Sequence, residues 1–342
     1  MQQSDEEKKS KTVAMNKTLK LYSGRSNLPL ATKIAEHVGV ELGVMKLETF
    51  ANGEIYARYL ESVRGCDVFI IQSVAGGVKG PGSAKDAFSV NDALMELLIM
   101  ADAAKRASAR TVTAVITHYG YSRQDKKSAS REPITAKMVA NLLTVAGIDR
   151  TIAIDLHQGQ IQGFFDTPVN HLTALPIFAE YFLEKRLENV CVVSPDVGRA
   201  KAAKKLADLL DAELAVMHKL RPAHNVAEIT DVIGDVVGKT CIINDDMIDT
   251  AGSVIGGILA LQKKGAGRIF ICATHGIFSG KAFAGLDAAE VEEVVVCDTV
   301  PMPTERPEKI KVISVAPLLA RAIENVFNEA SVSEFFDPDF QI

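Results

Sequence analysis

Short runs of apolar, often β-branched residues recur along this chain, with longer helical patterns between them. Each run is nearly continuous in apolar residues, as a strand buried on both faces must be. The runs are TLKLYS at 18–23, DVFIIQS at 67–73, TVTAVI at 111–116, RTIAID at 150–155, NVCVVS at 189–194, KTCIIN at 239–244 and RIFICA at 268–273. Helical stretches such as 91–107 and 199–210 lie between them. Strands that alternate with helices predict parallel sheets joined by right-handed crossovers.

The alternation occurs twice along the 342 residues, a length that fits two domains of ordinary size better than one. We therefore expect an α/β protein of two similar domains, each a parallel sheet flanked by helices. The expected divisions are a disordered tail at 1–17, an N-terminal domain at 18–168, a C-terminal domain at 169–310, and a C-terminal helix and tail at 311–342. That last helical stretch can pack on either domain.

The composition argues against several classes of protein. A net charge of -5 and a pI near 5.9 give no overall attraction to nucleic acid or to an anionic membrane. The chain has no run of about 20 apolar residues, so we expect no membrane span. Five cysteines without a C-x-x-C pair, all but Cys66 in apolar runs, predict buried reduced thiols. A reducing compartment, the cytoplasm, follows from that prediction.

The stretch CIINDDMIDTAGS at 241–253 places Asp245 and Asp246 side by side after a strand-like run. Two carboxylates about 4 Å apart repel by roughly 4 kcal/mol at an effective dielectric constant near 20, so a ligand or a cation is expected there. In parallel sheets, ligands collect beyond the carboxyl ends of the strands. The loop DTAGS adds small residues, two hydroxyls and the N-terminus of a helical stretch, which attracts anions.

A sugar phosphate would use both parts of this site. The loop would hold the phosphate, and the carboxylates would accept hydrogen bonds from ribose hydroxyls or hold Mg²⁺. The alternative is a helix capped by Asp249 or Thr250, with solvated neighbours and no ligand.

The segment DDMIDTAGS resembles the phosphoribosyl-pyrophosphate loop shared by phosphoribosyltransferases and ribose-phosphate pyrophosphokinases, with Ser253 in place of the usual Thr. Further stretches separate the two families: FANGEIYARYLESVRGCD at 50–67, YSRQDKKSASREPITAK at 121–137 and DLHQGQIQGFF at 155–165. Taken alone, the basic residues of 121–137 could hold the polyphosphate of a nucleotide or form a solvated face. Likewise, His157 alone could be a site residue or a structural histidine. In this order, from about Leu19 to Phe336, they resemble ribose-phosphate pyrophosphokinase, because simple phosphoribosyltransferases have one domain and lack these motifs.

The resemblance implies phosphoribosyltransferase-like domains and a set of site residues. Those implied for ATP are Phe50, Asn52, Glu54, Arg123, Gln124 and Asp125, the first three in the adenine pocket of a neighbouring subunit. Those implied for ribose 5-phosphate are Asp245, Asp246, Asp249, Thr250, Ala251, Gly252 and Ser253. His157 and Asp196 would position Mg²⁺. The implied catalytic residues are Lys219, Arg221 and His157.

The implied reaction transfers the pyrophosphoryl group of MgATP to the C1 hydroxyl of ribose 5-phosphate. It gives phosphoribosyl pyrophosphate and AMP for nucleotide biosynthesis. The resemblance also implies self-association, as a hexamer built from dimers, and a second site with inorganic phosphate as activator. The residues that match that second site are Ser62, Arg64, Ser108, Arg131, Ser331 and Phe336.

Besides Ser253, the chain departs from the family pattern at Arg199 and in the segment 74–89. Arg199 stands where a glycine is usual, which either alters the backbone near Asp196 or adds a phosphate contact. The Gly-rich segment 74–89 has the form of an insertion and is expected to be an exposed loop. The alternative function is a non-catalytic regulatory subunit of the same fold. Such a subunit should have lost the acids or the basic catalytic residues, and this chain keeps both.

Overall fold

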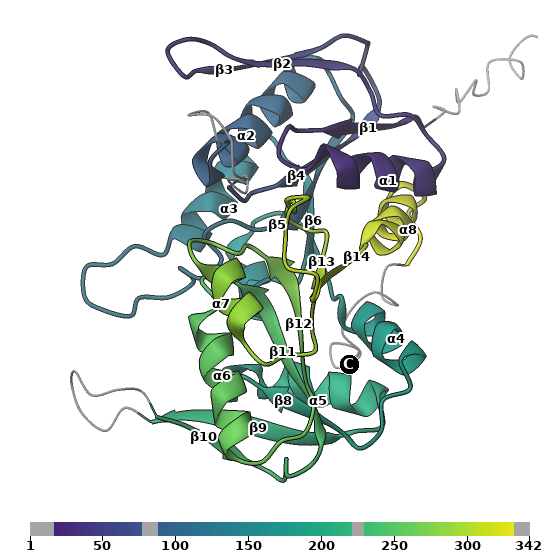
Figure 1. The fold of residues 1–342 in the computed structure, drawn as a ribbon. Coiled ribbons are helices and arrows are strands. Elements are labelled where there is room, and N and C mark those ends of the chain that lie inside the picture. Colours follow the sequence, from purple (N-terminus) through teal and green to yellow (C-terminus); the bar gives the residue numbers. More distant parts are fainter. Residues whose placement is uncertain (1–16, 77–87, 221–228, 332–342) are drawn as a thin grey trace, which may run out of the picture.

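The computed structural model describes residues 17–76, 88–220 and 229–331, which form two α/β lobes (Figure 1). The first lobe is built on a five-stranded parallel sheet with strand order β1-β4-β5-β6-β7. Its strands are β1 (Leu19–Ser23), β4 (Asp67–Ser73), β5 (Thr111–His118), β6 (Arg150–Ile154) and β7 (Val169–Leu172). A separate antiparallel hairpin, β2 (Met45–Thr49) and β3 (Ile55–Tyr59), projects from this lobe.

The second lobe is built on a seven-stranded sheet with strand order β10-β9-β8-β11-β12-β13-β14. It is parallel except for β10, which runs antiparallel at one edge. Its strands are β8 (Val190–Ser194), β9 (Glu213–Leu220), β10 (Ile229–Ile233), β11 (Thr240–Ile248), β12 (Ile269–Gly276), β13 (Glu293–Cys297) and β14 (Ile310–Ile313). The expected fold class, two parallel-sheet units flanked by helices, is confirmed.

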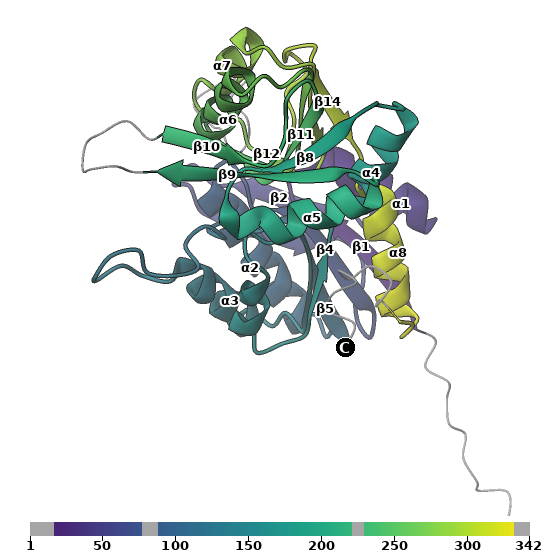
Figure 2. The same ribbon diagram turned by 90° about the horizontal axis from the view of Figure 1, so that it is seen from below.

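Helices cover both faces of each sheet. The α-helices are α1 (Leu28–Val38), α2 (Val90–Arg106), α3 (Thr135–Val145), α4 (Leu175–Glu184), α5 (Ala200–Leu209), α6 (Gly252–Lys263), α7 (Ala282–Ala288) and α8 (Ala316–Phe327). Two 3-10 helices, η1 (Gly159–Phe164) and η2 (Val197–Arg199), follow β6 and β8. Figure 2 shows α6 and α7 on the outer side of the second sheet and α4 and α5 on its inner side.

One apolar core spans both lobes. Side chains of β4, β5 and β6 share a buried cluster with Val192, Ile242 and Phe270 of the second sheet. Helices α1, α4, α5 and α8 supply most of the other members, and strands β1, β7, β12 and β13 also contribute. The outer faces have cores of their own, under α2 and α3 in the first lobe and under α6 and α7 in the second. Burial of apolar surface therefore fixes the two lobes against each other, and with them the edges of the sheets that form the site.

Several sequence expectations can be compared with this fold. Strand β4 has the expected bounds, and α8 packs against α1 of the first lobe. The first sheet extends past the expected boundary at residue 168, because β7 hydrogen-bonds to β6. All five cysteines are buried and free. Among the described helices, none is both long and apolar enough to cross a membrane. The expected tail and most of the 74–89 segment lie outside the described residues.

Candidate active site

Asp245 and Asp246, the acid pair, belong to a strand and not to the loop that follows it, which corrects the sequence expectation. The strand was expected to end at Asn244, but β11 continues to Ile248. Its pairing with β8 ends at Ile243, and beyond that residue it is paired with β12. The carboxylates of Asp245 and Asp246 therefore lie at the carboxyl edge of the sheet, where the β8 side is free of a strand. The segment that follows β8 fills part of this space.

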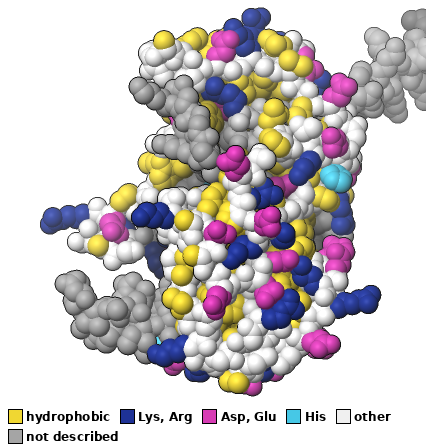
Figure 3. All heavy atoms as spheres, in the orientation of Figure 1, with side chains coloured by type: hydrophobic (Ala, Val, Ile, Leu, Met, Phe, Trp, Pro, Cys, Tyr) yellow, Lys and Arg dark blue, Asp and Glu magenta, His cyan; other side chains and the backbone are white. Residues whose placement is uncertain are grey.

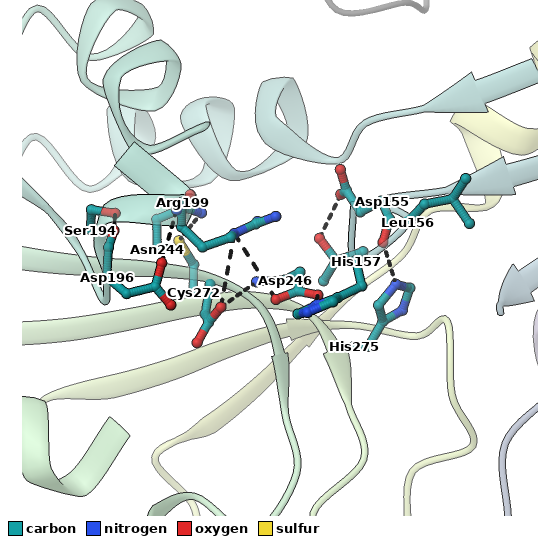
Figure 4. A network of polar contacts seen from close by, with 12 residues as sticks. Asp155, Leu156, His157, Ser194, Asp196, Arg199, Asn244, Asp246, Cys272 and His275 are labelled. Atoms are coloured by element: carbon teal, nitrogen blue, oxygen red, sulfur yellow. Dashed lines mark hydrogen bonds and ion pairs between the residues drawn. The ribbon is translucent and has the colours of Figure 1, made fainter. Parts of the chain in front are cut away.

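Charged groups from both lobes surround the acid pair (Figure 4). Asp246 is buried, and its Oδ2 lies 2.7 Å from Nδ1 of His157, which follows β6 in the first lobe. Arg199, at the end of η2, places its Nε 3.9 Å from Oδ1 of Asp245 and 4.0 Å from Oδ1 of Asp246. Asp196 caps η2 by accepting a hydrogen bond from the Arg199 N–H at 2.9 Å.

The pKa values of the two carboxyl groups are shifted in opposite directions. Burial, and then the neighbouring charge of Asp246, raise the pKa of Asp245. Burial also acts to raise the pKa of Asp246, but the hydrogen bond from His157 and the charge of Arg199 outweigh it and lower that pKa. The hydrogen bond to Asp246 in turn raises the pKa of His157 against the opposing effect of burial. Asp246 is therefore held as a carboxylate, whereas Asp245 takes up a proton at a higher pH than an ordinary aspartate does.

The loop after β11 leads into a helix N-terminus. Ala251, the N-cap of α6, has a φ of 63°, in the left-handed region that L-residues seldom adopt. This turn brings the first N–H groups of the twelve-residue α6 to the edge of a cavity of about 490 Å³. Residues 245–254 line that cavity together with Arg123, Lys126, His157, Gln158, Pro195, Asp196, Gly198 and Arg199. Free N–H groups and the helix dipole at such a position attract anions.

Of the residues expected to bind ATP, Arg123 lines the cavity, whereas Gln124 and Asp125 follow it in the chain and are not part of the lining. Arg123 lies in the segment between β5 and α3, and its Nη1 is 2.9 Å from Oδ2 of Asp249. Gln124 accepts a hydrogen bond from the Thr135 hydroxyl at 2.5 Å. The charge of Asp125 contributes to the raised pKa of His157. Figure 3 shows Lys and Arg side chains on the projecting segment between β5 and α3.

The other three expected ATP residues lie elsewhere. Phe50, Asn52 and Glu54 lie in the turn between β2 and β3, in the hairpin at the top of the first lobe, whereas β11 belongs to the second lobe (Figure 1). Phe50 is 48% exposed and stacks on Tyr56 at 5.7 Å between ring centroids. Within one chain these three residues do not reach the acid pair, so the expected role would require a second copy.

The cavity offers carboxylate oxygens, that of Asp196 among them, to a magnesium ion that arrives with a phosphate ligand. Mg²⁺ usually binds one or two protein carboxylates, substrate phosphates and water. Asp196, Asp245 and Asp246 all line the cavity. Within the described part of the chain, no group of three or more His, Cys, Asp or Glu side chains could hold a metal ion. His157, expected to help position Mg²⁺, has its Nδ1 engaged with Asp246.

The remaining expected residues are partly outside the described structure. Arg221 and Phe336 lie outside the described residues, and the Lys219 side chain is not described. Of the expected second site, Ser62 and Arg64 line one hollow, and the carbonyl of Ser108 accepts the Gly65 N–H at 2.8 Å. Arg131 lies on the segment after β5, and Ser331 follows α8 on the other side of the molecule (Figure 1). One chain therefore does not bring all the described members of this set together.

Sequence reasoning left open whether Arg199 alters the backbone near Asp196 or adds a phosphate contact, and it did not place Arg199 beside the acid pair. The signal was present, because an arginine stood where the family pattern has glycine, but the sequence did not show where its side chain points. Asn244 is a second such residue: it is buried beside the acid pair and donates to Sγ of Cys272 at 3.3 Å. No sequence pattern singled it out.

An acid pair beside a helix N-terminus, at the carboxyl edge of a parallel sheet, is an arrangement typical of α/β proteins that bind phosphate ligands. Residues 19–147 match the N-terminal domain of ribose phosphate pyrophosphokinase, and residues 222–337 match the phosphoribosyl synthetase-associated domain. The chain belongs to the ribose-phosphate pyrophosphokinase family.

Individual relatives are similar over nearly their whole length. The ribose-phosphate pyrophosphokinase of Fusobacterium nucleatum is 48% identical over 93% of this chain and 98% of its own. That of Caldanaerobacter subterraneus is 50% identical over the same shares. The crystal structure of phosphoribosylpyrophosphate synthetase from Mycobacterium smegmatis superposes with a TM-score of 0.83 at 44% identity, covering 92% of this chain and all of that one.

Proposed function

We propose that this chain transfers the pyrophosphoryl group of MgATP to the C1 hydroxyl of ribose 5-phosphate, forming phosphoribosyl pyrophosphate and AMP. The observation that carries the proposal is a single cavity lined from both lobes. The second lobe supplies the acid pair and the loop before α6, and the first supplies Arg123 and His157. Such a cavity can hold a sugar phosphate and a nucleotide phosphate next to each other.

The geometry gives each part of the site a task. The N-terminus of α6 would take the sugar's phosphate, and Asp246 and Asp245 would accept hydrogen bonds from the ribose hydroxyls. The 1-hydroxyl would then face the phosphates held by Arg123. Its oxygen would attack the β-phosphorus, and the bond from that phosphorus to the oxygen shared with the α-phosphorus would break. AMP would leave with that oxygen, and the hydroxyl proton would pass to water. Placement and neutralisation of charge supply most of the rate in such transfers.

His157 would act by positioning. Its hydrogen bond to Asp246 crosses between the lobes and holds that carboxylate ionised. Mg²⁺ bound with the nucleotide would neutralise phosphate charge. Lys219 and Arg221 would add positive charge to the transferred group, as an arginine finger does.

The proposal extends to the assembly and to the cell. Phe50, Asn52 and Glu54 are far from the acid pair of their own chain, which supports a nucleotide pocket shared between subunits of a hexamer built from dimers. Inorganic phosphate would activate at a second site assembled in the same way. Five buried free thiols support a location in the reducing cytoplasm.

The test is AMP formation from ATP and Mg²⁺, with and without ribose 5-phosphate, each at low and high inorganic phosphate. We expect AMP only when the sugar phosphate is present, and more of it at high phosphate. AMP formation independent of the sugar would contradict the reaction. No AMP under any condition would favour the regulatory-subunit alternative.

A further inference from the structure

The Nε of Arg199 lies at ion-pair distance from both carboxylates of the acid pair but forms no hydrogen bond with either. Its side chain is 16% exposed, and its Nε lies within 4.0 Å of an oxygen of each carboxylate. Nevertheless, among the described residues this buried Nε has no hydrogen-bond partner. A buried N–H without a partner costs free energy. The Nε of Arg199 is therefore attracted to the two carboxylates by charge, and no hydrogen bond to a described residue fixes its position.

The position of Arg199 leaves its side chain room to move. Arg199 lines the 490 Å³ cavity of the acid pair and also a second cavity of about 750 Å³. The second cavity is bounded by η1, the start of α4 and the start of α5. Gly198, Asp245 and His157 also line both cavities. The guanidinium therefore lies at the boundary between them, with open space on each side.

Without a counter-ion, the acid pair would attract free cations. Two adjacent carboxylates in a partly desolvated place are hard oxygen ligands of the kind that divalent cations bind. An arginine offers a positive charge that cannot be removed by deprotonation and cannot diffuse away. It also costs less to desolvate than a compact ammonium group, because a guanidinium is weakly hydrated.

We propose that Arg199 is a tethered counter-ion that keeps free divalent cations off Asp245 and Asp246 while the sugar site is empty. When a sugar phosphate binds, its hydroxyls take the two carboxylates and the guanidinium moves into the 750 Å³ cavity. Arg199 is thus a specificity-determining residue, one that reserves the acid pair for the sugar. The identity of the sugar ligand rests on the proposed function, whereas the exclusion of cations does not.

The experiment measures Mn²⁺ binding to the full-length protein without nucleotide, using electron paramagnetic resonance to detect free Mn²⁺. In Arg199→Met we expect Mn²⁺ to bind at least about tenfold more tightly than in the unaltered protein. The free energy of a tenfold change in affinity is only part of the interaction energy between two unit charges about 4 Å apart. Arg199→Lys retains the charge, so its affinity should stay within about threefold of the unaltered protein. Unchanged affinity in Arg199→Met would overturn the proposal, and so would a lysine variant that behaves like the methionine variant.

Matched controls separate this effect from general electrostatics. Lys126 lines the same cavity and, within the described residues, forms no ion pair with either carboxylate. Lys126→Ala removes the same charge and should leave Mn²⁺ affinity within about threefold. Adding Asp246→Asn to Arg199→Met should abolish the gain in affinity. If the double variant kept the gain, the new ion would be bound elsewhere and the proposal would fail.

A second arm tests the displacement. Ribose 5-phosphate added to Arg199→Met should release the bound Mn²⁺, because both ligands need the same carboxylates. If Mn²⁺ stayed bound at saturating ribose 5-phosphate, the claim that both ligands use the same carboxylates would be wrong. If Arg199→Met fails to fold, as judged by near-ultraviolet circular dichroism, Arg199→Gln serves in its place. None of these readouts requires turnover, so a failure of the AMP assay and a failure of this proposal remain distinguishable.

Discussion

The imidazole of His157 and the carboxylate of Asp246 meet across the two lobes, with Nδ1 and Oδ2 2.7 Å apart. His157 follows β6 of the first sheet, and Asp246 lies in β11 of the second. A second contact, between Arg123 and Asp249 at 2.9 Å, also crosses between the lobes at the same cavity. The geometry of the site therefore depends on how the two lobes pack. We expect a substitution at either contact to lower the turnover number more than it lowers the free energy of unfolding.

Replacing His157 by Ala should lower the turnover number by at least about 100-fold, the scale of losing one group that stabilises a transition state. The physical reason is the loss of the group that orients and ionises Asp246. Steady-state AMP formation measures the change, and a thermal melt close to that of the unaltered protein shows that the variant is folded. Near-normal turnover in a folded variant would contradict the positioning role.

The same pair predicts a pH dependence of stability. The hydrogen bond to Asp246 raises the pKa of His157 in the folded state, so this bond stabilises the protein fully below the unfolded pKa of about 6.5. The contribution is lost as pH rises through the raised folded pKa. Asp246, whose pKa is lowered, stays ionised throughout that range.

The measurement compares the free energy of unfolding of the unaltered protein and of His157→Gln, by urea titration in a chelator at about pH 6 and about pH 9. The difference between the two proteins should be larger at the lower pH. Other titrating groups cancel in that difference. A difference that does not change with pH would show that the imidazole is neutral in the folded protein.

The sequence predicted the repeated strand pattern well because buried parallel strands are continuous apolar runs, as in β4. It failed at the end of β11, because aspartates are rare in strands and their sequence reads as a loop. Hydrogen bonding to β12 overrides that local preference. The β2–β3 hairpin was also missed, although Asn52-Gly53 is a strong hairpin-turn signal, and Gly53 has a φ of 92°.

The sequence named several of the residues that line the cavity, but it did not predict how they are arranged. The apposition of Asp245 and Asp246 could be read from adjacent letters, and the family resemblance supplied His157. The contact between His157 and Asp246 depends on how two lobes pack through a shared core, which no local pattern encodes. The position of Arg199 over both carboxylates depends on β8 ending before β11 does.

Asp246→Asn should weaken ribose 5-phosphate binding far more than ATP binding. The variant keeps the shape of the side chain but removes the charge that would accept hydrogen bonds from the ribose hydroxyls, an effect of about 1.5–3 kcal/mol per charged hydrogen bond. Isothermal titration calorimetry with each ligand separately measures the two affinities. Equal losses for both ligands would point instead to damage of a shared metal site or of the fold.

Ala251→Val should weaken ribose 5-phosphate binding by at least about tenfold while leaving ATP affinity within about threefold. Ala251 is 4% exposed and has a φ of 63°. A β-branched residue is strongly disfavoured there, so the turn that presents the N-terminus of α6 to the cavity must rearrange. Ala251→Gly is the matched control, because glycine adopts this φ without strain and should retain sugar-phosphate binding. Isothermal titration of both variants with ribose 5-phosphate decides the matter. If valine and glycine bound the sugar phosphate equally well, the left-handed turn at Ala251 would have no part in holding the phosphate.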